Sequence, residues 1–269
     1  MKIILSKDKL EKIIHNEKSL GFVPTMGAIH FGHVSLIKKC LSQCNKTIVS
    51  IFINKPQFNK KNDFKKYPRV LKKDILILKK LKVDYLYLPT FKQIYPRGLN
   101  RKIKISGLEK KLCGKFRPGH FKSVADVIDR FIKIIKPNKI YFGEKDMQQL
   151  KIIEDFVKKN HPSTKVIGCK TVREKNGIAL SSRNFLLSPK EKEIASKIFT
   201  LLSRNKKYLI KKQISLTKIK NKIFNLGVSK IDYVEIQDIN KLTRPYKKNN
   251  KYRIFVAYYI KTIRLIDNI

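Results

Sequence analysis

Long hydrophobic runs are missing from this 269-residue sequence, and no stretch approaches the ~18 apolar residues that a membrane-spanning helix requires. The N-terminal stretch MKIILSKDKL has only Ile3, Ile4 and Leu5 before charged residues return. Such a run is too short for the hydrophobic core of a signal peptide. We therefore expect a cytoplasmic protein that has no membrane partner.

Cysteine is scarce, and none of the four cysteines belongs to a C-x-x-C pair: Cys40, Cys44, Cys113 and Cys169. Cys40 and Cys44 lie one helical turn apart and could form half of a metal site, but no matching His/Cys cluster occurs elsewhere. We expect ordinary reduced thiols, and we assign no residue as a metal ligand.

Acidic residues are few, with 20 Asp and Glu against 62 Lys and Arg, so the formal net charge is +42. Such an excess is typical of a nucleic-acid-binding protein. The cations are mostly lysines scattered over every segment among abundant Ile and Asn, as A·T-rich codons would produce. No RNA-binding signature or regular spacing of stacking aromatics accompanies them. We favour compositional drift and expect no specific nucleic-acid partner, with an RNA-binding module as the alternative.

The hydrophobic fraction of 42% fits a globular chain, and the length allows one large domain or two modest ones. Apolar, β-branched runs predict strands that alternate along the chain with segments of helical spacing. This alternation is typical of a Rossmann-like, doubly wound parallel sheet in an α/β protein. The predicted strands are 21–24, 47–54, 83–89, 139–143 and 164–172, and the predicted helices are 34–41, 70–82, 125–135 and 146–160.

The pattern changes after about residue 175. A helix is predicted over 188–205, where Ser188 precedes Pro189 and Glu191 follows three residues after the serine, as in a capping box. Segments 230–239 and 252–260 alternate as half-exposed strands with a polar loop between them. We therefore predict two domains, residues 1–175 with the Rossmann-like sheet and residues 176–269 as a smaller α+β domain.

The stretch FVPTMGAIHFGHVSLIKKC combines two histidines and two glycines where a strand gives way to a helix. Gly27 and Gly32 allow a ligand to approach the backbone closely. His30 and His33 are three residues apart, so both would project from one face of the first helical turn. A helix N-terminus attracts anions, and imidazole N–H groups can donate to phosphate oxygens. The stretch therefore predicts phosphate chemistry rather than two packing histidines.

Two further stretches follow predicted strands, where open α/β sheets bind their ligands. In the first, Gly143 precedes Glu144, Lys145 and Asp146. Lysine suits a phosphate, and the carboxylates could hold ribose hydroxyls or a metal. Gln149 shares a helical face with Asp146.

In the second stretch, SSRN, the side chains of Ser181, Ser182 and Arg183 predict a phosphate clamp. Asn54 and Gln57 end another buried run, and their amides both donate and accept, which suits a small hydroxy acid. The stretch RPGHF (117–121) forms a glycine turn to which spacing alone assigns no chemistry.

Six stretches occur in one order: PTMGAIHFGH, SIFINKPQF, DFKKYPR, FRPGHFKSV, FGEKDMQQL and TVREKNGIALSSRN. Together they resemble the pantothenate synthetase (pantoate–β-alanine ligase) family, and the likeness extends to the final RLIDNI. The H-x-G-H motif alone marks only the wider nucleotidyltransferase-like superfamily, so another adenylyltransferase remains the alternative. The resemblance implies a homodimer with a C-terminal lid. It also implies ATP-dependent condensation of (R)-pantoate with β-alanine through pantoyl adenylate, with ATP as a substrate and Mg²⁺ bound through its phosphates.

The resemblance also implies residue roles, with His33 as proton donor and His30, Lys145 and Arg183 beside it in the catalytic group. It places pantoate and β-alanine at Gln57, with Asn54 nearby, and pantoate also at Gln149. The residues that it assigns to ATP are Met26, Gly27, Ala28, Ile29, His30, Phe31, Gly32, His33, Gly143, Glu144, Lys145, Asp146, Val172, Leu180, Ser181, Ser182 and Arg183. Two positions depart from the family pattern: Lys55 precedes Pro56 where Asn is common, and Ser123 replaces a Gly.

Overall fold

A six-stranded parallel sheet forms the centre of the larger part of the chain. The computed structural model describes residues 1–239, 242 and 251–269. The strand order is β1-β4-β3-β2-β5-β6, and every neighbouring pair is parallel, which confirms the predicted doubly wound sheet. The strands are β1 (Lys2–Ile4), β2 (Leu20–Thr25), β3 (Lys46–Ile51), β4 (Tyr85–Tyr87), β5 (Lys139–Gly143) and β6 (Lys165–Cys169).

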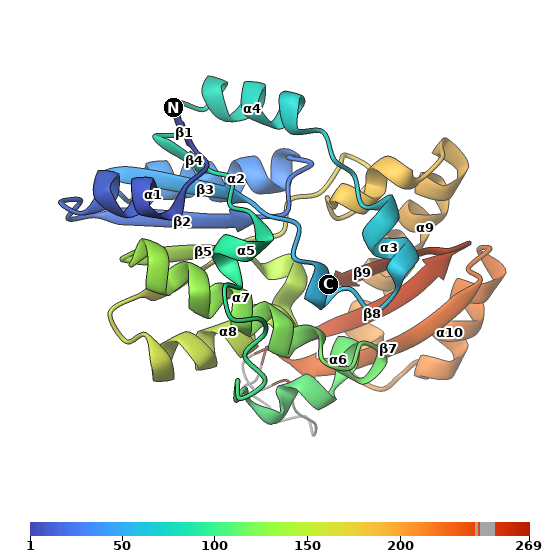
Figure 1. Ribbon diagram of the computed structural model, residues 1–269. Coiled ribbons are helices and arrows are strands. Elements are labelled where there is room, and N and C mark those ends of the chain that lie inside the picture. The colour runs from blue at the N-terminus through green and yellow to red at the C-terminus, as the bar shows by residue number, and fades with distance from the viewer. Residues whose placement is uncertain (240–241, 243–250) are drawn as a thin grey trace.

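Helices cover both faces of this sheet, as Figure 1 shows. On one face lie α1 (Lys7–Ile14), α7 (His120–Ile135) and α8 (Met147–Asn160), and on the other lie α2 (Phe31–Leu41) and α4 (Leu71–Lys80). Successive strand residues therefore alternate between two apolar cores. Phe22 belongs to the core under α1 and α7, whereas Val23 belongs to the core under α2 and α4.

Helix α2 packs closely on β2, because Gly21 leaves room for two cysteines. A Cβ atom at Gly21 would collide with Cys40 Sγ and would lie 2.8 Å from Cys44 Sγ. All four cysteines are free, as predicted, and Cys40 Sγ lies 3.3 Å from the hydroxyl of Thr47. The one-turn spacing of Cys40 and Cys44 therefore serves helix–strand packing. Within the described residues, no three His, Cys, Asp or Glu side chains form a metal-binding group.

The ends of several elements differ from the predicted ones. β2 was predicted to end at Pro24, but it continues to Thr25, since Pro24 and Thr25 remain in register with Ser50 and Ile51 of β3. On its other side, β2 pairs with β5 only at Gly21 and Phe22. Proline has no N–H for a strand ladder, so it is tolerated where one neighbour has already diverged.

Strand β3 ends at Ile51 rather than at residue 54, because the chain turns into the 3-10 helix η1 (Lys55–Gln57). Helix α7 begins at His120, five residues before its predicted start, after Gly119 adopts φ +76°. The shorter helices are α3 (Lys61–Lys66), α5 (Phe91–Ile94), α6 (Leu112–Phe116), η2 (Gly107–Lys110), η3 (Glu144–Asp146) and η4 (Ser182–Leu186).

A smaller antiparallel sheet follows, with β7 (Lys230–Asp238), β8 (Tyr252–Ile260) and β9 (Ile263–Asn268) in the order β7-β8-β9. It confirms the predicted α+β character of the C-terminal part. Strand β9 was not predicted, and the expected polar loop between β7 and β8 lies mostly outside the described residues. The proposed boundary between residues 175 and 176 stays a prediction.

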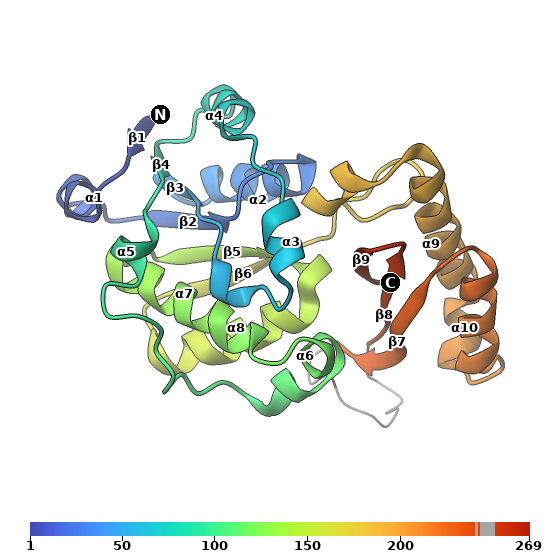
Figure 2. The same ribbon diagram turned by 45° about the vertical axis from the view of Figure 1, so that its right-hand side comes forward.

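Helices α9 (Pro189–Ile210) and α10 (Leu216–Asn225) cover one face of this sheet, the face away from the six-stranded sheet (Figure 2). The opposite face contributes Tyr233 and Phe255 to the core beneath α7 and α8. Helix α9 begins as predicted, because the Ser188 side chain accepts from Glu191 N and the Glu191 side chain accepts from Ser188 N. None of the helices described is long and apolar enough to cross a membrane.

Candidate active site

A cavity of about 250 Å³ opens beyond the carboxyl ends of β2 and β5. This is the point at which the strand order reverses, because β2 leads to β3 on one side and neighbours β5 on the other. Crevices at such switch points are the usual binding sites of open α/β sheets. The early divergence of β2 and β5 places Pro24, Thr25, Tyr141 and Phe142 in the wall of the cavity.

Most of the predicted site residues meet in this cavity, although they come from distant parts of the chain. Those that line it are Met26, His30, Gly32, His33, Asn54, Gln57, Gly143, Lys145, Asp146, Gln149, Val172, Leu180, Ser181, Ser182 and Arg183. Their joint placement supports the predicted site, while their individual ligand contacts stay predictions.

Five residues predicted to bind ATP do not line the cavity: Gly27, Ala28, Ile29, Phe31 and Glu144. The Phe31 side chain is 76% exposed. Glu144 forms an ion pair with Arg253 at 2.9 Å, so it joins the C-terminal sheet to η3. Any contact of these residues with ATP stays a prediction.

Asp74 of α4 holds the loop between β2 and α2. Its carboxylate accepts from Ile29 N at 2.7 Å and from Ala28 N at 2.9 Å, and Asp74 is only 1% exposed. Gly27 and Ala28 both have positive φ, at 81° and 51°, a conformation that is costly for alanine. Burial raises the pKa of the Asp74 carboxyl, while the two N–H donors oppose that shift. Asp74 therefore supports the loop that places His30.

The two histidines of the H-x-G-H motif cap α2 with their own rings. His30 Nδ1 accepts from Gly32 N at 3.1 Å, and His33 Nδ1 accepts from His30 N at 3.4 Å. Both rings must therefore be unprotonated at Nδ1, so each neutral ring carries its proton on Nε2. The rings stack with centroids 4.0 Å apart. The cap thus leaves each Nε2–H available as a donor.

Burial also keeps these two rings neutral. Burial, with a smaller contribution from the Lys145 charge, lowers the pKa of His30 to about 4. Burial lowers the pKa of His33 well below its usual value, and His30 and Lys145 lower it further. At neutral pH both imidazoles are therefore hydrogen-bond donors rather than cations.

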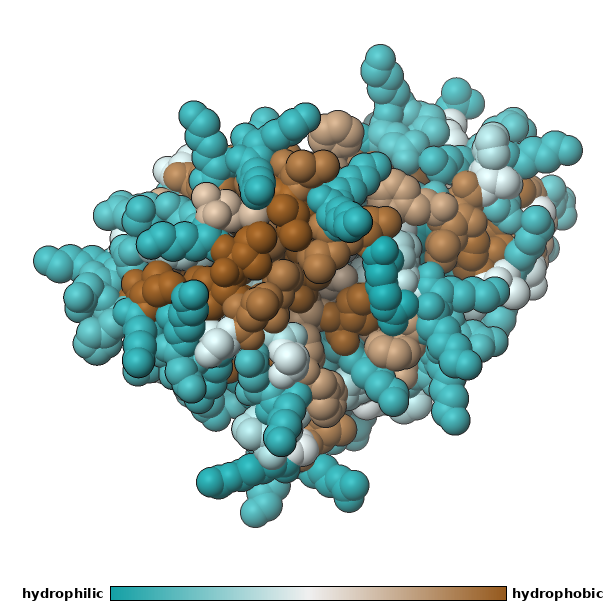
Figure 3. All heavy atoms as spheres, turned by 45° about the horizontal axis from the view of Figure 1, so that its top comes forward, coloured by the Kyte–Doolittle hydropathy of each residue, from teal (hydrophilic) through white to brown (hydrophobic). Residues whose placement is uncertain are grey.

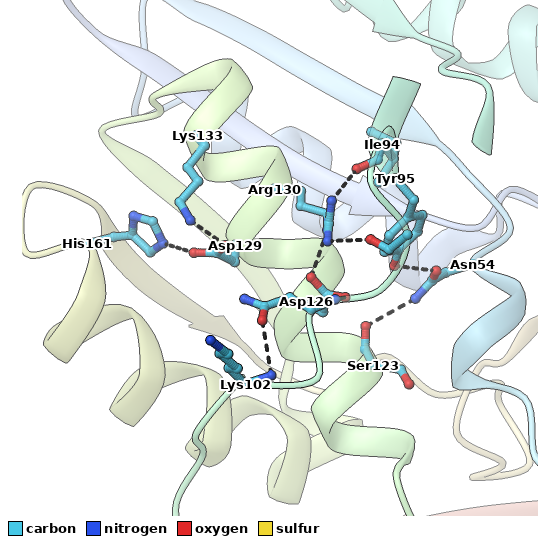
Figure 4. Close-up of polar contacts among 12 residues, drawn as sticks. Asn54, Ile94, Tyr95, Lys102, Ser123, Asp126, Asp129, Arg130, Lys133 and His161 are labelled. Atoms are coloured by element: carbon cyan, nitrogen blue, oxygen red, sulfur yellow. Dashed lines mark hydrogen bonds and ion pairs between the residues drawn. The ribbon is translucent and has the colours of Figure 1, made fainter. Parts of the chain in front are cut away.

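A series of side-chain hydrogen bonds sets the orientation of the Gln57 amide, and Figure 4 shows its contacts among Tyr95, Asn54 and Ser123. The Tyr95 hydroxyl donates to Asn54 Oδ1 at 2.8 Å, and Asn54 Nδ2 donates to the Ser123 carbonyl at 3.2 Å. Because that carbonyl can only accept, the Asn54 amide cannot be flipped. Asn54 Nδ2 also donates to Gln57 Oε1 at 3.1 Å, so Gln57 Nε2 faces Met26 Sδ at 3.0 Å. Gln57 therefore presents N–H groups to the cavity.

The Arg130 side chain of α7 fixes Tyr95, at which this series of hydrogen bonds starts. Its guanidinium lies 4.5 Å from the centre of the Tyr95 ring and pairs with Asp126 at 2.7 Å. It also donates to the carbonyl of Ile94 (Figure 4) and to the carbonyl of Gly98. These contacts explain why Tyr95 can remain buried with its hydroxyl aimed at Asn54.

Two cationic side chains of the cavity, Arg183 and Lys145, lie beside carboxylates, and the C-terminal strand binds the backbone of the turn that carries Lys145. Arg183 pairs with Asp63 of α3 at 2.9 Å, and Lys145 lies 3.8 Å from Asp146. Asn268 of β9 donates to the carbonyls of Glu144 and Lys145, each at 2.8 Å. The smaller sheet is therefore joined directly to the turn that carries Lys145.

Sequence reasoning did not identify five residues of this site: Asp63, Tyr67, Asp74, Arg117 and His120. Arg117 and His120 belong to the stretch RPGHF, whose spacing was noticed but not interpreted. His120 Nδ1 donates to the Gln57 carbonyl at 2.7 Å. Asp63 and Tyr67 belong to the stretch DFKKYPR, which contributed to the family resemblance but was given no role, and Asp74 stands in an ordinary helical pattern without a local signal.

Comparison with known proteins identifies the family. The model of the pantoate–β-alanine ligase family matches residues 2–269. The pantothenate synthetase of Flavobacterium psychrophilum is 42% identical over 98% of this chain and 95% of its own length. The enzyme of the same name from Azobacteroides pseudotrichonymphae is 44% identical over 97% of this chain and 95% of its own.

Solved structures agree. The pantoate–β-alanine ligase of Francisella tularensis, crystallised with a β,γ-ATP ligand and β-alanine, has a TM-score of 0.88 and 42% identity, covering 100% of this chain and 97% of its own. The pantothenate synthetase of Thermus thermophilus has a TM-score of 0.89 and 31% identity, covering 100% and 99%. Fold, site and full-length similarity lead to one conclusion. This chain belongs to the pantoate–β-alanine ligase family of ATP-dependent ligases, which act in pantothenate biosynthesis.

Proposed function

We propose that this chain joins (R)-pantoate to β-alanine in two steps within the one cavity. In the first step, a pantoate carboxylate oxygen attacks the α-phosphorus of ATP, and pyrophosphate leaves. In the second step, the β-alanine nitrogen attacks the acyl carbon of the pantoyl adenylate, and AMP leaves. The observation that carries the proposal is the convergence of His30, His33, Lys145 and Arg183 on a cavity that also holds two glutamine amides.

The first step brings a carboxylate towards a triphosphate, so the site must offset the repulsion between anions. The Nε2–H groups of His30 and His33 are aligned donors for phosphate oxygens, and Lys145 and Arg183 add positive charge. Donors fixed before the reaction stabilise the developing charge without having to reorient. His33 is the proton donor in this proposal, acting through Nε2–H, and the remaining predicted ATP residues surround the nucleotide.

The amides suit the uncharged part of the acid. Gln57 Nε2 points into the cavity because its Oε1 is already bound to Asn54, and Gln149 lines the same space. Both could bind the hydroxyl and carboxyl oxygens of pantoate. Around them, Phe52, Val124 and Phe131 supply apolar walls for its methyl groups.

Magnesium fits the site as a companion of ATP. Within described residues 1–239, two carboxylates line the cavities beside Lys145, those of Asp63 and Asp146. Asp63 is paired with Arg183, so Asp146 is the candidate ligand. Mg²⁺ usually keeps several waters and binds through one or two carboxylates together with substrate phosphates. We propose that the ion is held mainly by the phosphates of ATP, whose charge it neutralises when bound.

We also propose that the chain forms a homodimer. An apolar face lies around the edge strand β1 and helices α4 and α5, where Ile3, Leu5, Leu71, Leu76 and Phe91 are all at least 40% exposed. Figure 3 shows apolar atoms gathered on this side of the molecule. A patch of this kind is a common feature of subunit interfaces.

The test of the dimer is the mass in solution. We expect light scattering to give twice the mass of the chain at micromolar concentration, and the double substitution Leu5→Lys/Leu76→Lys to give a monomer. A monomeric parent protein would contradict the proposal.

The adenylation step should depend strongly on His33 and Lys145. We expect His33→Ala and Lys145→Ala each to lower pantoate-dependent ATP–pyrophosphate exchange by roughly 10²–10³-fold, since each removes a donor aimed at developing charge. The assay contains ATP, Mg²⁺, pantoate and labelled pyrophosphate, and leaving out each in turn tests the proposed function itself. Lys158→Ala, on the exposed side of α8, is the control. Exchange at the parent rate in either variant would remove that residue from the mechanism.

The stability of the free protein should fall in mildly acidic solution. The folded-state pKa of His30 is about 4, below the usual 6.5, so between these values the unfolded chain binds more protons than the folded chain. Stability is therefore complete above about pH 6.5 and decreases as the pH falls towards 4. We expect His30→Asn, which keeps a capping side chain, to show a smaller decrease in melting temperature over this range. Identical pH profiles would refute the assigned protonation state.

Tyr95 should affect pantoate binding through Asn54 and Gln57. Tyr95→Phe leaves the buried Asn54 Oδ1 without its donor and removes one of the two contacts that hold Asn54 against Gln57, so we expect the KM for pantoate to rise roughly tenfold while the KM for ATP stays constant. Tyr87→Phe is the matched control, because the buried Tyr87 hydroxyl has no hydrogen-bond partner among the described residues. Equal effects of the two substitutions, measured by steady-state kinetics, would dismiss the hydrogen-bond chain.

A further inference from the structure

Arg117 occupies the junction of three cavities. It ends the short helix α6, and its side chain lines the main cavity together with two smaller ones of about 80 and 30 Å³. The smaller cavities extend from the main one towards Ile266 and Asp267 of β9. The guanidinium is thus placed where the adenylation site meets space leading to the C-terminal sheet.

Within residues 1–239, 242 and 251–269, the charge of Arg117 has no carboxylate partner. Among the described residues, three arginines line these cavities, and the other two are paired: Arg183 with Asp63 at 2.9 Å and Arg264 with Asp232 at 2.8 Å. No carboxylate of the described residues lies within 4.0 Å of Arg117, whose recorded hydrogen bonds go to neutral groups. Burial, reinforced by the charge of Arg183, lowers the pKa of Arg117 to about 10. A partly buried cation without a counter-ion is costly unless a ligand supplies the negative charge.

The neutral contacts fix the direction of the guanidinium. Arg117 Nη2 donates to the Gln57 carbonyl at 3.1 Å, and Arg117 Nη1 lies 3.1 Å from His120 Nε2. His120 Nδ1 must donate to the same carbonyl, so its Nε2 is the acceptor for Arg117. Two of the five N–H groups of the guanidinium are thereby used. The others can form the forked pair of bonds that arginine makes with a carboxylate.

We propose that Arg117 binds the carboxylate of β-alanine during the second step, an inference that rests on the proposed function. In the proposed function, His30, His33 and Lys145 serve the phosphates, Gln149 serves pantoate, and Gln57 offers pantoate and β-alanine only a neutral amide. The anion still without a matching cation is the β-alanine carboxylate, which stays charged from substrate to product. The nitrogen at the other end loses one proton to water, attacks the acyl carbon to form the amide bond and then loses a second proton to water. The bond between the acyl carbon and the AMP oxygen breaks, and AMP leaves with its electron pair. Arg117 makes no bond in this step but holds the nucleophile.

The test compares two amines and two half-reactions in Arg117→Gln, with Arg101→Gln at an exposed position as the matched control. Pantoate-dependent ATP–pyrophosphate exchange, run without β-alanine, should stay within about twofold of the parent protein. The KM for β-alanine in amide formation should rise roughly 10- to 100-fold, as expected for losing hydrogen bonds between charged groups. Propylamine, which has the amine but no carboxylate, should react with an unchanged kcat/KM. The control should match the parent in every assay.

Other outcomes would overturn the assignment. A parallel loss of exchange would place Arg117 on ATP or pantoate, and an equal loss with both amines would make its role structural. If the parent protein itself shows no pantoate-dependent exchange, the proposed function fails and this inference falls with it. If Arg117→Gln does not fold, Arg117→Lys decides the question, because it keeps the charge without the forked geometry. The measured quantity is the ratio of kcat/KM for β-alanine to kcat/KM for propylamine, which should fall below that of the parent protein.

Discussion

The separation of β2 from β5 is the constraint on which the rest of the site depends. The two strands pair only at their beginnings, at Gly21 and Phe22, and β2 continues beside β3 alone. Because Pro24 cannot contribute an N–H to a ladder, the gap does not close further along. The space that results lies at the reversal of strand order, and the loops after both strands turn into it.

Backbone groups, more than side-chain charges, orient the chemistry in this space. The N–H groups at the start of α2 bind the Nδ1 atoms of both histidines, and this leaves the Nε2 protons for a ligand. In the same way, the Gln57 carbonyl receives both His120 and Arg117, and the Ser123 carbonyl determines how Asn54 faces Gln57. Each polar side chain is therefore set in one orientation before any substrate arrives, which is what electrostatic preorganisation requires.

The C-terminal sheet takes part in the same arrangement. Asn268 binds the carbonyls of Glu144 and Lys145, and Arg253 binds the Glu144 carboxylate. Arg173, which precedes the serine–arginine stretch, forms a forked pair with Asp267 at 2.6 and 2.9 Å. Two of the segments that line the cavity are thereby tied to β9. Movement of this sheet would be transmitted directly to the turn that carries Lys145.

The sequence by itself determined the doubly wound sheet, the capped helix at Ser188 and about half of the residues that line the cavity. These features depend on local information: apolar periodicity, cap residues and compact motifs such as H-x-G-H, which need no distant partner to be recognised. It also favoured free thiols over a metal site, and the packing of Cys40 and Cys44 against Gly21 gives the reason.

Only the tertiary structure decided what those side chains do. The protonation of His30 follows from burial beside Lys145, and the direction of the Gln57 amide follows from Asn54, which Tyr95 and Ser123 hold from later in the sequence. The support from Asp74 depends on its contact with two backbone N–H groups, and the charge of Arg117 is unpaired because no carboxylate of the described residues lies close to it. Such properties arise from distances between segments far apart in the sequence, and no periodicity or motif within one segment records them.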